Sequence, residues 1–149
     1  MSLSNSAEND LLLLLFNNTN WANLGDATGL RGATTAGSFY IALHTADPGE
    51  TGNQTTSEIA YTNYARVAVA RSSGGWTVSG TAPTQVANAA SVSFPTCGAS
   101  GGTATHFSIG RDSSGTGEII VSGALTSSLA ISNGITPSFA IGQLTATVD

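Results

Sequence analysis

The sequence is poor in charge. Charged residues make up 9% of the 149 residues, against about 25% in an average protein. The sequence contains no lysine, its four basic residues are arginines, and its formal net charge is −5. Phosphate binding needs a clustered basic surface, so this composition excludes a nucleic-acid-binding protein. Surface charges keep protein molecules apart in solution, and this chain has few of them. We therefore expect partners to cover much of its surface. The alternative is a surface kept soluble by serine and threonine hydroxyls.

Cysteine and long apolar runs are also scarce. Cys97 is the only cysteine, which excludes an intrachain disulfide, and we expect a small buried side chain there rather than a nucleophile. The run from Leu11 to Phe16 is far too short to span a bilayer. Glu8 and Asp10 precede it and no positive charge does, unlike a secretory signal. We therefore expect a protein that is made in the cytoplasm and has no membrane partner.

Glycine and small β-tolerant residues are abundant instead and favour strands joined by tight turns. Residues 38–44 place an apolar side chain at every second position, the period of a strand with one buried face. The sequence Asp-Pro-Gly at 47–49 is typical of a turn. Residues 66–71 alternate again, so we expect a second strand to return there.

Later segments repeat this pattern. Glycine-containing turns separate them at about the spacing that indicates a sandwich or a barrel. Ser122-Gly123 is expected to form a bulge. The further expected strands are 76–79, 86–94, 103–111, 117–125, 129–132, 138–141 and 143–148. The sequence therefore predicts an all-β fold.

One helix is expected, at residues 5–17. Asn5 or Ser6 can cap its beginning, and Asn17-Asn18 can end it. The five leucines at 11–15 cover its whole circumference, and a helix that is apolar all round favours burial on more than one side. Two interpretations remain open: an ordinary core helix, or an arm that packs into a neighbour or under the sheets.

Residues 17–37 show neither the helical nor the strand period and are expected to form a long loop over a surface. Trp21 and Leu24 are isolated apolar anchors within this loop. A connection this long is often a contact segment. We therefore expect an N-terminal helix and loop arm at 1–37 and a β-sandwich domain at 38–149.

Three patterns resemble catalytic or metal sites. Ser100 lies in a G-x-S-x-G match at 98–102, but a strand is expected after it where a nucleophile elbow needs a helix. His44 and His106 could hold a metal with Asp47 only if the fold brought them together, and no ligand spacing supports this. Residues 112–118 resemble a calcium loop but lack its acidic positions, and we expect a hairpin turn. The sequence thus predicts no catalytic, cofactor-binding or metal-binding residue, and no enzyme.

The arginines offer a different role. Arg66 and Arg71 can form ion pairs with Asp47, Glu50 or Glu58.

Several segments, in this order, resemble a family of small virion proteins of tailed bacteriophages, which are often labelled tail-fibre-like. The resemblance covers almost the whole chain, least in the 17–37 loop. This chain departs from the family at Gly98–Gly102, which stands where the family would have a tryptophan-containing turn before Thr103. The matching segments are Met1–Ser4, Glu8-Asn9 before the leucines, Phe39–Gly52, Glu58–Tyr61, Tyr64–Arg66, Phe94-Pro95, Thr105–Phe107, Ser122–Leu125 and Gly142–Asp149.

The resemblance implies a jelly-roll-like β-sandwich that decorates or cements an icosahedral head, with no catalytic residues to carry over. The expected function is therefore that of a capsid cement protein on the outer capsid surface of the virion, which stabilises the lattice. Its expected partners are the major capsid protein and further copies of itself, as a dimer or trimer.

The alternative is a tail-fibre or tail-tip module that binds a receptor or glycan. Aromatic side chains would then serve as stacking platforms. The candidates are Trp21, Tyr40, Tyr61, Tyr64 and Trp76.

Overall fold

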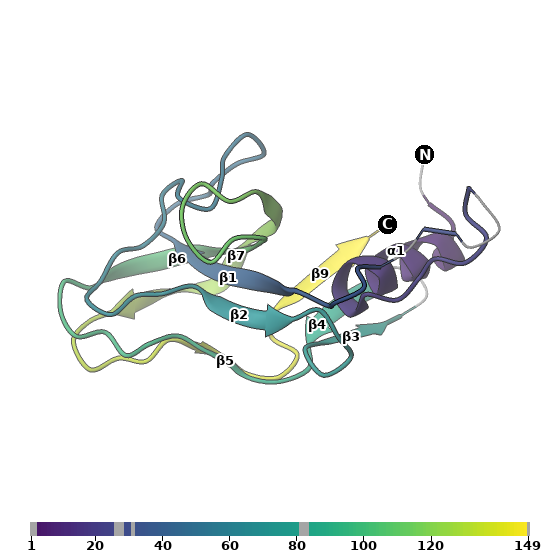
Figure 1. Ribbon diagram of the computed structural model, residues 1–149. Coiled ribbons are helices and arrows are strands. Elements are labelled where there is room, and N and C mark those ends of the chain that lie inside the picture. The colour runs from purple at the N-terminus through teal and green to yellow at the C-terminus, as the bar shows by residue number, and fades with distance from the viewer. Residues whose placement is uncertain (1–2, 26–28, 31, 81–83, 149) are drawn as a thin grey trace. The chain divides into compact units, whose positions relative to one another are not determined.

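A computed structural model describes residues 3–25, 29–30, 32–80 and 84–148 of the chain. This part of the chain forms one helix and nine strands, in three sheets with the orders β2-β1-β6-β7, β3-β4-β9 and β5-β8 (Figure 1). The elements are α1 (Asn5–Asn17), β1 (Ser38–His44), β2 (Val67–Ala70), β3 (Trp76–Ser79), β4 (Thr84–Asn88), β5 (Val92–Ser93), β6 (Gly102–Gly110), β7 (Ile119–Ile131), β8 (Ser138–Phe139) and β9 (Thr145–Val148). The expected class, an all-β sandwich with a short N-terminal helix, is confirmed.

Contacts within the chain gather into two compact units. The first unit comprises residues 1–38, 70–91 and 139–149, and the second comprises residues 39–69 and 92–138. The expected division into a 1–37 arm and a 38–149 domain stays a prediction.

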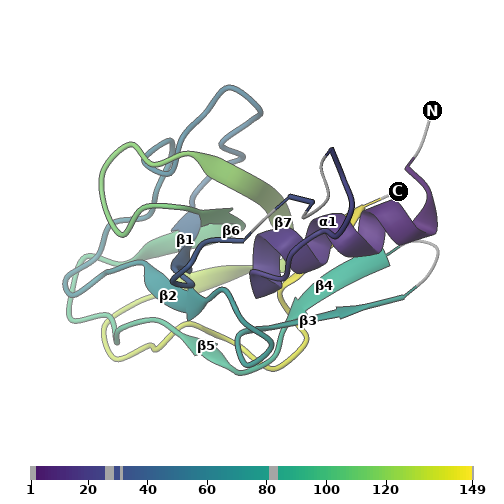
Figure 2. The same ribbon diagram turned by 45° about the vertical axis from the view of Figure 1, so that its right-hand side comes forward.

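The predicted helix is confirmed as α1, and it packs against β3 and β4 within the first unit (Figure 2). Leu12 and Phe16 lie one turn apart and are buried. The Phe16 ring meets the fully buried Trp76 ring edge to face, with centroids 4.9 Å apart. The helix therefore covers its own sheet as a core helix does, while the other leucines of the run are half-buried.

The helix begins at Asn5 as expected, but its N-cap lies one residue earlier than expected. Ser4 is the N-cap, not Asn5 or Ser6, because Ser4 has an extended backbone and Asn5 is already helical. The Ser4 hydroxyl accepts a hydrogen bond from the Ala7 amide. No helix in the described ranges is long and apolar enough to cross a membrane.

Two residues satisfy the C-terminal end of α1. Asn18 takes the left-handed conformation, with φ of 56°, that commonly ends a helix. From the segment after β2, the Arg71 guanidinium donates to the carbonyl oxygens of Leu15 at 2.6 Å and Leu14 at 2.8 Å. A cation at this end also interacts favourably with the helix dipole.

Buried polar groups connect the elements of the first unit. The Thr84 hydroxyl donates to the buried Glu8 carboxylate. Asn88, 1% exposed, donates through Nδ2 to the Ala140 carbonyl and accepts from the Leu144 amide. Because a buried amide must be bonded, Asn88 fixes the turn that leads into β9.

In the second unit, β1 and β6 pair in the middle of the four-stranded sheet. Ile41 lies opposite Ile109, and both are fully buried. Ala42 and His44, on the other face of β1, are fully buried as well. The predicted strand is therefore confirmed, but both of its faces are covered where it reaches His44.

Some strand boundaries differ from those expected. The expected strand 86–94 divides into β4 and β5, which belong to different sheets. The two segments expected around residue 125 are one long edge strand, β7. Its register with β6 shifts at Ile120 and at residues 125–128. The expected bulge at Ser122-Gly123 is wrong, because both residues pair in regular register with Ser108 and Phe107, and Gly123 makes room for the Phe107 ring.

Candidate functional site

The second unit contains a buried ion pair between Glu58 and Arg66, one of the pairs that the sequence predicts. Arg66 donates from Nε and Nη2 to the two Glu58 oxygens, at 2.7 and 2.8 Å. The two side chains are 3% and 16% exposed, Arg66 being the more buried. The hydrogen bond to Glu58 raises the pKa of Arg66. The two hydrogen bonds therefore hold both side chains in place.

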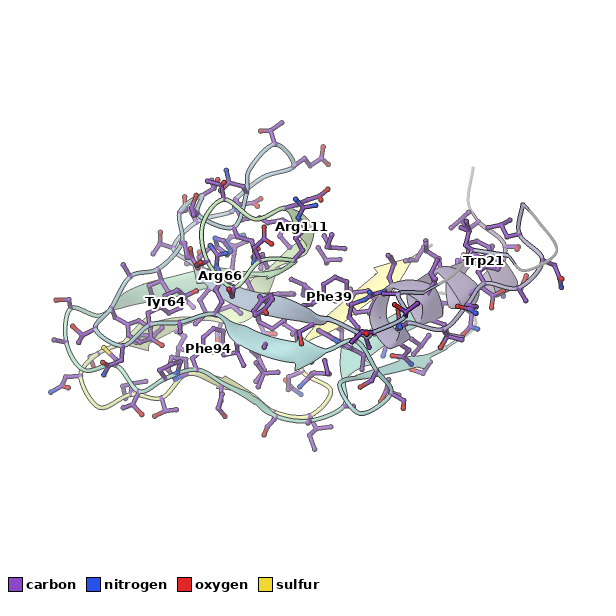
Figure 3. The ribbon with its side chains drawn as sticks, in the orientation of Figure 1. Trp21, Phe39, Tyr64, Arg66, Phe94 and Arg111 are labelled. Carbon is purple, nitrogen blue, oxygen red and sulfur yellow. The ribbon has the colours of Figure 1, made fainter. Side chains whose placement is uncertain are left out.

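Tyr64 extends this cluster. Its hydroxyl donates to Glu58 and accepts from the Leu43 amide. Burial raises the pKa of Tyr64 well above its usual value. Its ring stacks on Phe94 at a centroid distance of 6.2 Å, and Figure 3 shows both side chains near Arg66.

The same arginine holds the hairpin loop between β6 and β7. Its Nη1 and Nη2 donate to the carbonyls of Asp112 and Gly115, at 3.0 and 2.8 Å. The side-chain oxygen of the fully buried Gln54 accepts from the Asp112 backbone amide, and the Gln54 backbone amide donates to the Gly117 carbonyl. Residues 112–118 thus form the predicted turn.

A hollow of about 170 Å³ lies beside the ion pair, with Ser113, Ser114 and Gly115 in its lining. Its arginine and its carboxylate already neutralise each other. The arrangement therefore fixes a loop and offers little charge to a ligand.

Another hollow, of about 260 Å³, lies between the turn after β1 and the start of β7. Gly49, Glu50, Gly52 and residues 119–122 line it. In both ribbon views the loop after β1 lies beside the beginning of β7 (Figures 1 and 2). Its lining combines glycines, Ser122 and three aliphatic residues, and its single ionisable group is the Glu50 carboxylate.

The turn that carries Glu50 is well fixed. The Asp47 carboxylate accepts from the Gly49 amide, and Gly49 has the φ of 68° that the expected turn requires. The Gly52 amide donates back to the Gly49 carbonyl. A Cβ at Gly52 would meet the Pro48 carbonyl, so only glycine fits there.

The structure brings the two histidines together but not as metal ligands. His44 and His106 face each other on β1 and β6. Both His44 nitrogens are already bonded, Nδ1 to the Thr56 carbonyl and Nε2 to the Ser108 hydroxyl, each at 2.8 Å. Burial lowers the pKa of His44. Within the described ranges, no three His, Cys, Asp or Glu residues lie close enough to hold a metal.

The serine and cysteine candidates lie elsewhere. Ser100 is exposed with φ of 56°, and β6 follows it where a nucleophile elbow needs a helix. The serine that does contact a histidine is Ser108, which is fully buried. Cys97 is buried, as expected, with its thiol near the Ala99 carbonyl.

The proposed aromatic platforms are largely unavailable. Trp76 is fully buried and Tyr61 is 6% exposed, so neither ring presents a free face. Tyr64 is stacked on Phe94. Trp21 and Tyr40 remain half-buried.

The loop after α1 is more ordered than expected. The backbones of Trp21 and Leu30 form a bridge with hydrogen bonds of 2.8 and 2.9 Å. The Asn18 side chain pairs with both backbone groups of Ala33. Leu24 and Leu30 are exposed on this loop, 39% and 47%, and Leu3 is 44% exposed before the helix. We call these three leucines the arm leucines.

Gln54 and Asn88 position loops, and sequence reasoning missed both. Each is an amide in a polar stretch, and the partners of Gln54 lie up to 63 positions further along the chain. No local period marks such a residue.

Comparison with known proteins gives one family. The model of the family described as Podophage GP4 fiber I protein gp80 matches residues 2–147. No curated protein matches the chain. The family match agrees with the resemblance to phage virion proteins and covers both units. The chain therefore belongs to the Podophage GP4 fiber I protein gp80 family, a family of phage virion proteins.

Proposed function

We propose that this protein is a non-enzymatic structural subunit of the fibre region of the phage particle, where it binds other virion proteins. The observation that carries this proposal is the family match, which spans residues 2–147 and bears the description of a fibre protein. The proposal corresponds to the tail-fibre alternative of the sequence analysis. It does not include glycan stacking, because Tyr61 and Trp76 are buried.

The surface supports a role in contacts with proteins. The arm leucines are exposed in the first unit, and Ile141 is 68% exposed on a turn that Asn88 fixes. A partner that covers these side chains would remove their apolar surface from water, which favours binding. With charged residues at only 9%, few ionic groups would need to be desolvated when a partner covers this surface.

A capsid cement protein is the second candidate, because the resemblance of the ordered sequence segments to small phage virion proteins implies decoration of a head. Its partners would be the major capsid protein and further copies of this chain. A ligand that binds only the assembled shell stabilises that shell by mass action. Many weak contacts on a lattice would raise the avidity without a strong single site.

Copy number and position in purified particles test both candidates. Quantitative mass spectrometry and antibody labelling in electron micrographs should find a small number of copies at the fibre. Hundreds of copies over the head would replace this proposal with the cement function. Particles without the protein would contradict both.

The arm leucines provide a test of the contact. Deletion of residues 1–37 would remove α1 and the Phe16–Trp76 contact, so loss of binding would be ambiguous. Replacing Leu24 and Leu30 by serine removes exposed apolar surface and leaves the helix intact. We expect this variant to fold but to enter particles poorly, while the matched control Ile135→Ser, at a 40% exposed side chain in the second unit, enters normally. Normal incorporation of the arm variant would exclude the arm as the contact.

The absence of catalysis is part of the proposal. If purified protein hydrolyses an ester, Ser100→Ala should leave the rate unchanged. A loss of activity in that variant would indicate an enzyme.

A further inference from the structure

The hollow beside Glu50 combines three aliphatic residues with one carboxylate. Ile119, Ile120 and Val121 are the aliphatic part of its lining, and Ile120 is 36% exposed at a position where the register with β6 shifts. A hollow of about 260 Å³ has room for one long side chain. A lysine or arginine fits this chemistry, because its aliphatic stem packs on apolar surface while its charged head reaches a carboxylate.

The Glu50 carboxylate is free to take such a partner. In the part of the chain that the structure describes, it forms no ion pair or hydrogen bond. The neighbouring Asp47 is occupied with the Gly49 amide, and Glu118 pairs with Arg111 at 3.3 Å. The turn already holds Glu50 in place, so binding costs little ordering of the backbone.

The composition of the chain argues against a second copy as the occupant. The chain contains no lysine. Among the described residues, Arg66 is buried against Glu58, Arg71 bonds the end of α1, and Arg111 pairs with Asp112 and Glu118. The described part of a second copy therefore has no unengaged basic side chain to offer.

We infer that the hollow formed by Glu50 and residues 119–122 binds a lysine or arginine side chain, flanked by apolar residues, of a different virion protein. The inference rests on the proposed function, since it names the chemistry of a partner within the particle. The net charge of −5 adds a general attraction for such a segment.

A peptide titration tests this site. The probe is N-acetyl-Leu-Arg-Leu-amide, added to the full ¹⁵N-labelled chain at physiological salt and followed by amide chemical shifts. We expect saturable shifts at residues 49–52 and 119–122. The same peptide with citrulline in place of arginine keeps the shape of the side chain without its charge. It should bind at least about fivefold more weakly.

Two variants remove one negative charge from the same turn. Glu50→Gln should weaken arginine-peptide binding about fivefold. Asp47→Asn is the matched control, because asparagine can still accept from the Gly49 amide and residue 47 does not line the hollow. Its affinity should change by less than about twofold, since an exposed charge outside the hollow is screened by salt. Ile120→Ser tests the aliphatic part of the lining and should also weaken binding.

Three results would overturn the inference: shifts spread over all acidic surface residues, equal losses in the two turn variants, or equal binding of the citrulline peptide. If the protein without peptide self-associates and shifts these same amides, the occupant is a second copy instead. Counting copies in particles is independent of this titration, so the proposed function and the inference can fail separately.

Discussion

At the scale of single residues, we expect the Glu58–Arg66 ion pair to be important for the stability of the fold. Arg66 is 3% exposed at its side chain, so removal of Glu58 would leave a buried cation with only carbonyl partners. Breaking a buried pair from one side costs about 3 kcal/mol or more.

Glu58→Ala should therefore lower the free energy of unfolding by about 3 kcal/mol in urea denaturation. Glu118→Ala is the control, because Glu118 and its partner Arg111 are both 63% exposed. Exposed pairs contribute about 1 kcal/mol or less. Similar losses for the two variants would show that Arg66 is not held in the buried state described.

The buried His44 is expected to make the free energy of unfolding depend on pH. Burial lowers the pKa of His44 below its ordinary value of 6.5, so the unfolded chain binds this proton more readily than the folded chain. The contribution of His44 to stability is therefore fully present above about pH 6.5 and is lost as pH falls through the lower folded pKa.

The free energy of unfolding, measured from pH 8 to pH 5, should fall more for the wild type than for His44→Gln. The variant is expected to be less stable at pH 8, because glutamine cannot reproduce both hydrogen bonds of the imidazole. His106 and the carboxylates are common to both proteins, so the difference between the two curves isolates His44. Parallel curves would contradict the prediction.

At the scale of elements, α1 depends on a residue far along the chain. Arg71 donates to the last carbonyls of the helix, which otherwise lack intrahelical partners. Arg71→Met should destabilise the first unit by about 1.5 kcal/mol, the usual contribution of hydrogen bonds from a charged group.

Amide exchange in residues 5–17, measured by mass spectrometry, should quicken in Arg71→Met. The control is Arg111→Met, which removes an exposed arginine of the second unit. Unchanged exchange of α1 in the Arg71 variant would mean that the cap does not stabilise the helix.

At the scale of the whole molecule, we expect a core mutation in one unit to destabilise that unit and leave the other unchanged. Phe16→Ala removes the ring that packs on Trp76 and should cost about 3 to 5 kcal/mol. We expect hydrogen exchange to accelerate in β3, β4 and β9, and to stay slow in β1 and β6. Equal acceleration in both sets of strands would show that the units unfold together.

The sequence was informative wherever a local period or turn residue determines the structure. The alternation in residues 38–44 and the turn at Gly49 both depend on neighbours in sequence, and both are confirmed. The apolar run of α1 predicted the helix in the same way.

Other features depend on partners that are distant in sequence. Glycine at position 123 indicated a bulge, but it makes room for the Phe107 ring on the neighbouring strand β6. Whether His44 is a ligand or a core residue depends on Ser108, 64 positions away. The hollow at Glu50 joins a turn to a strand about 70 positions later, and no spacing rule links the two. Tertiary pairing determines these contacts, so the sequence alone could not predict them.

The distribution of aromatic side chains gives each unit its own optical signal. Both tryptophans, Trp21 and Trp76, belong to the first unit, and all three tyrosines, Tyr40, Tyr61 and Tyr64, belong to the second. Trp76 is fully buried against Phe16, so we expect a blue-shifted emission that moves to longer wavelength when α1 leaves its sheet. Fluorescence excited at the red edge, where only tryptophan absorbs, should thus follow the first unit alone, and the second-derivative absorbance bands of tyrosine should follow the second. One unlabelled sample can show which half of the chain a partner loosens or protects.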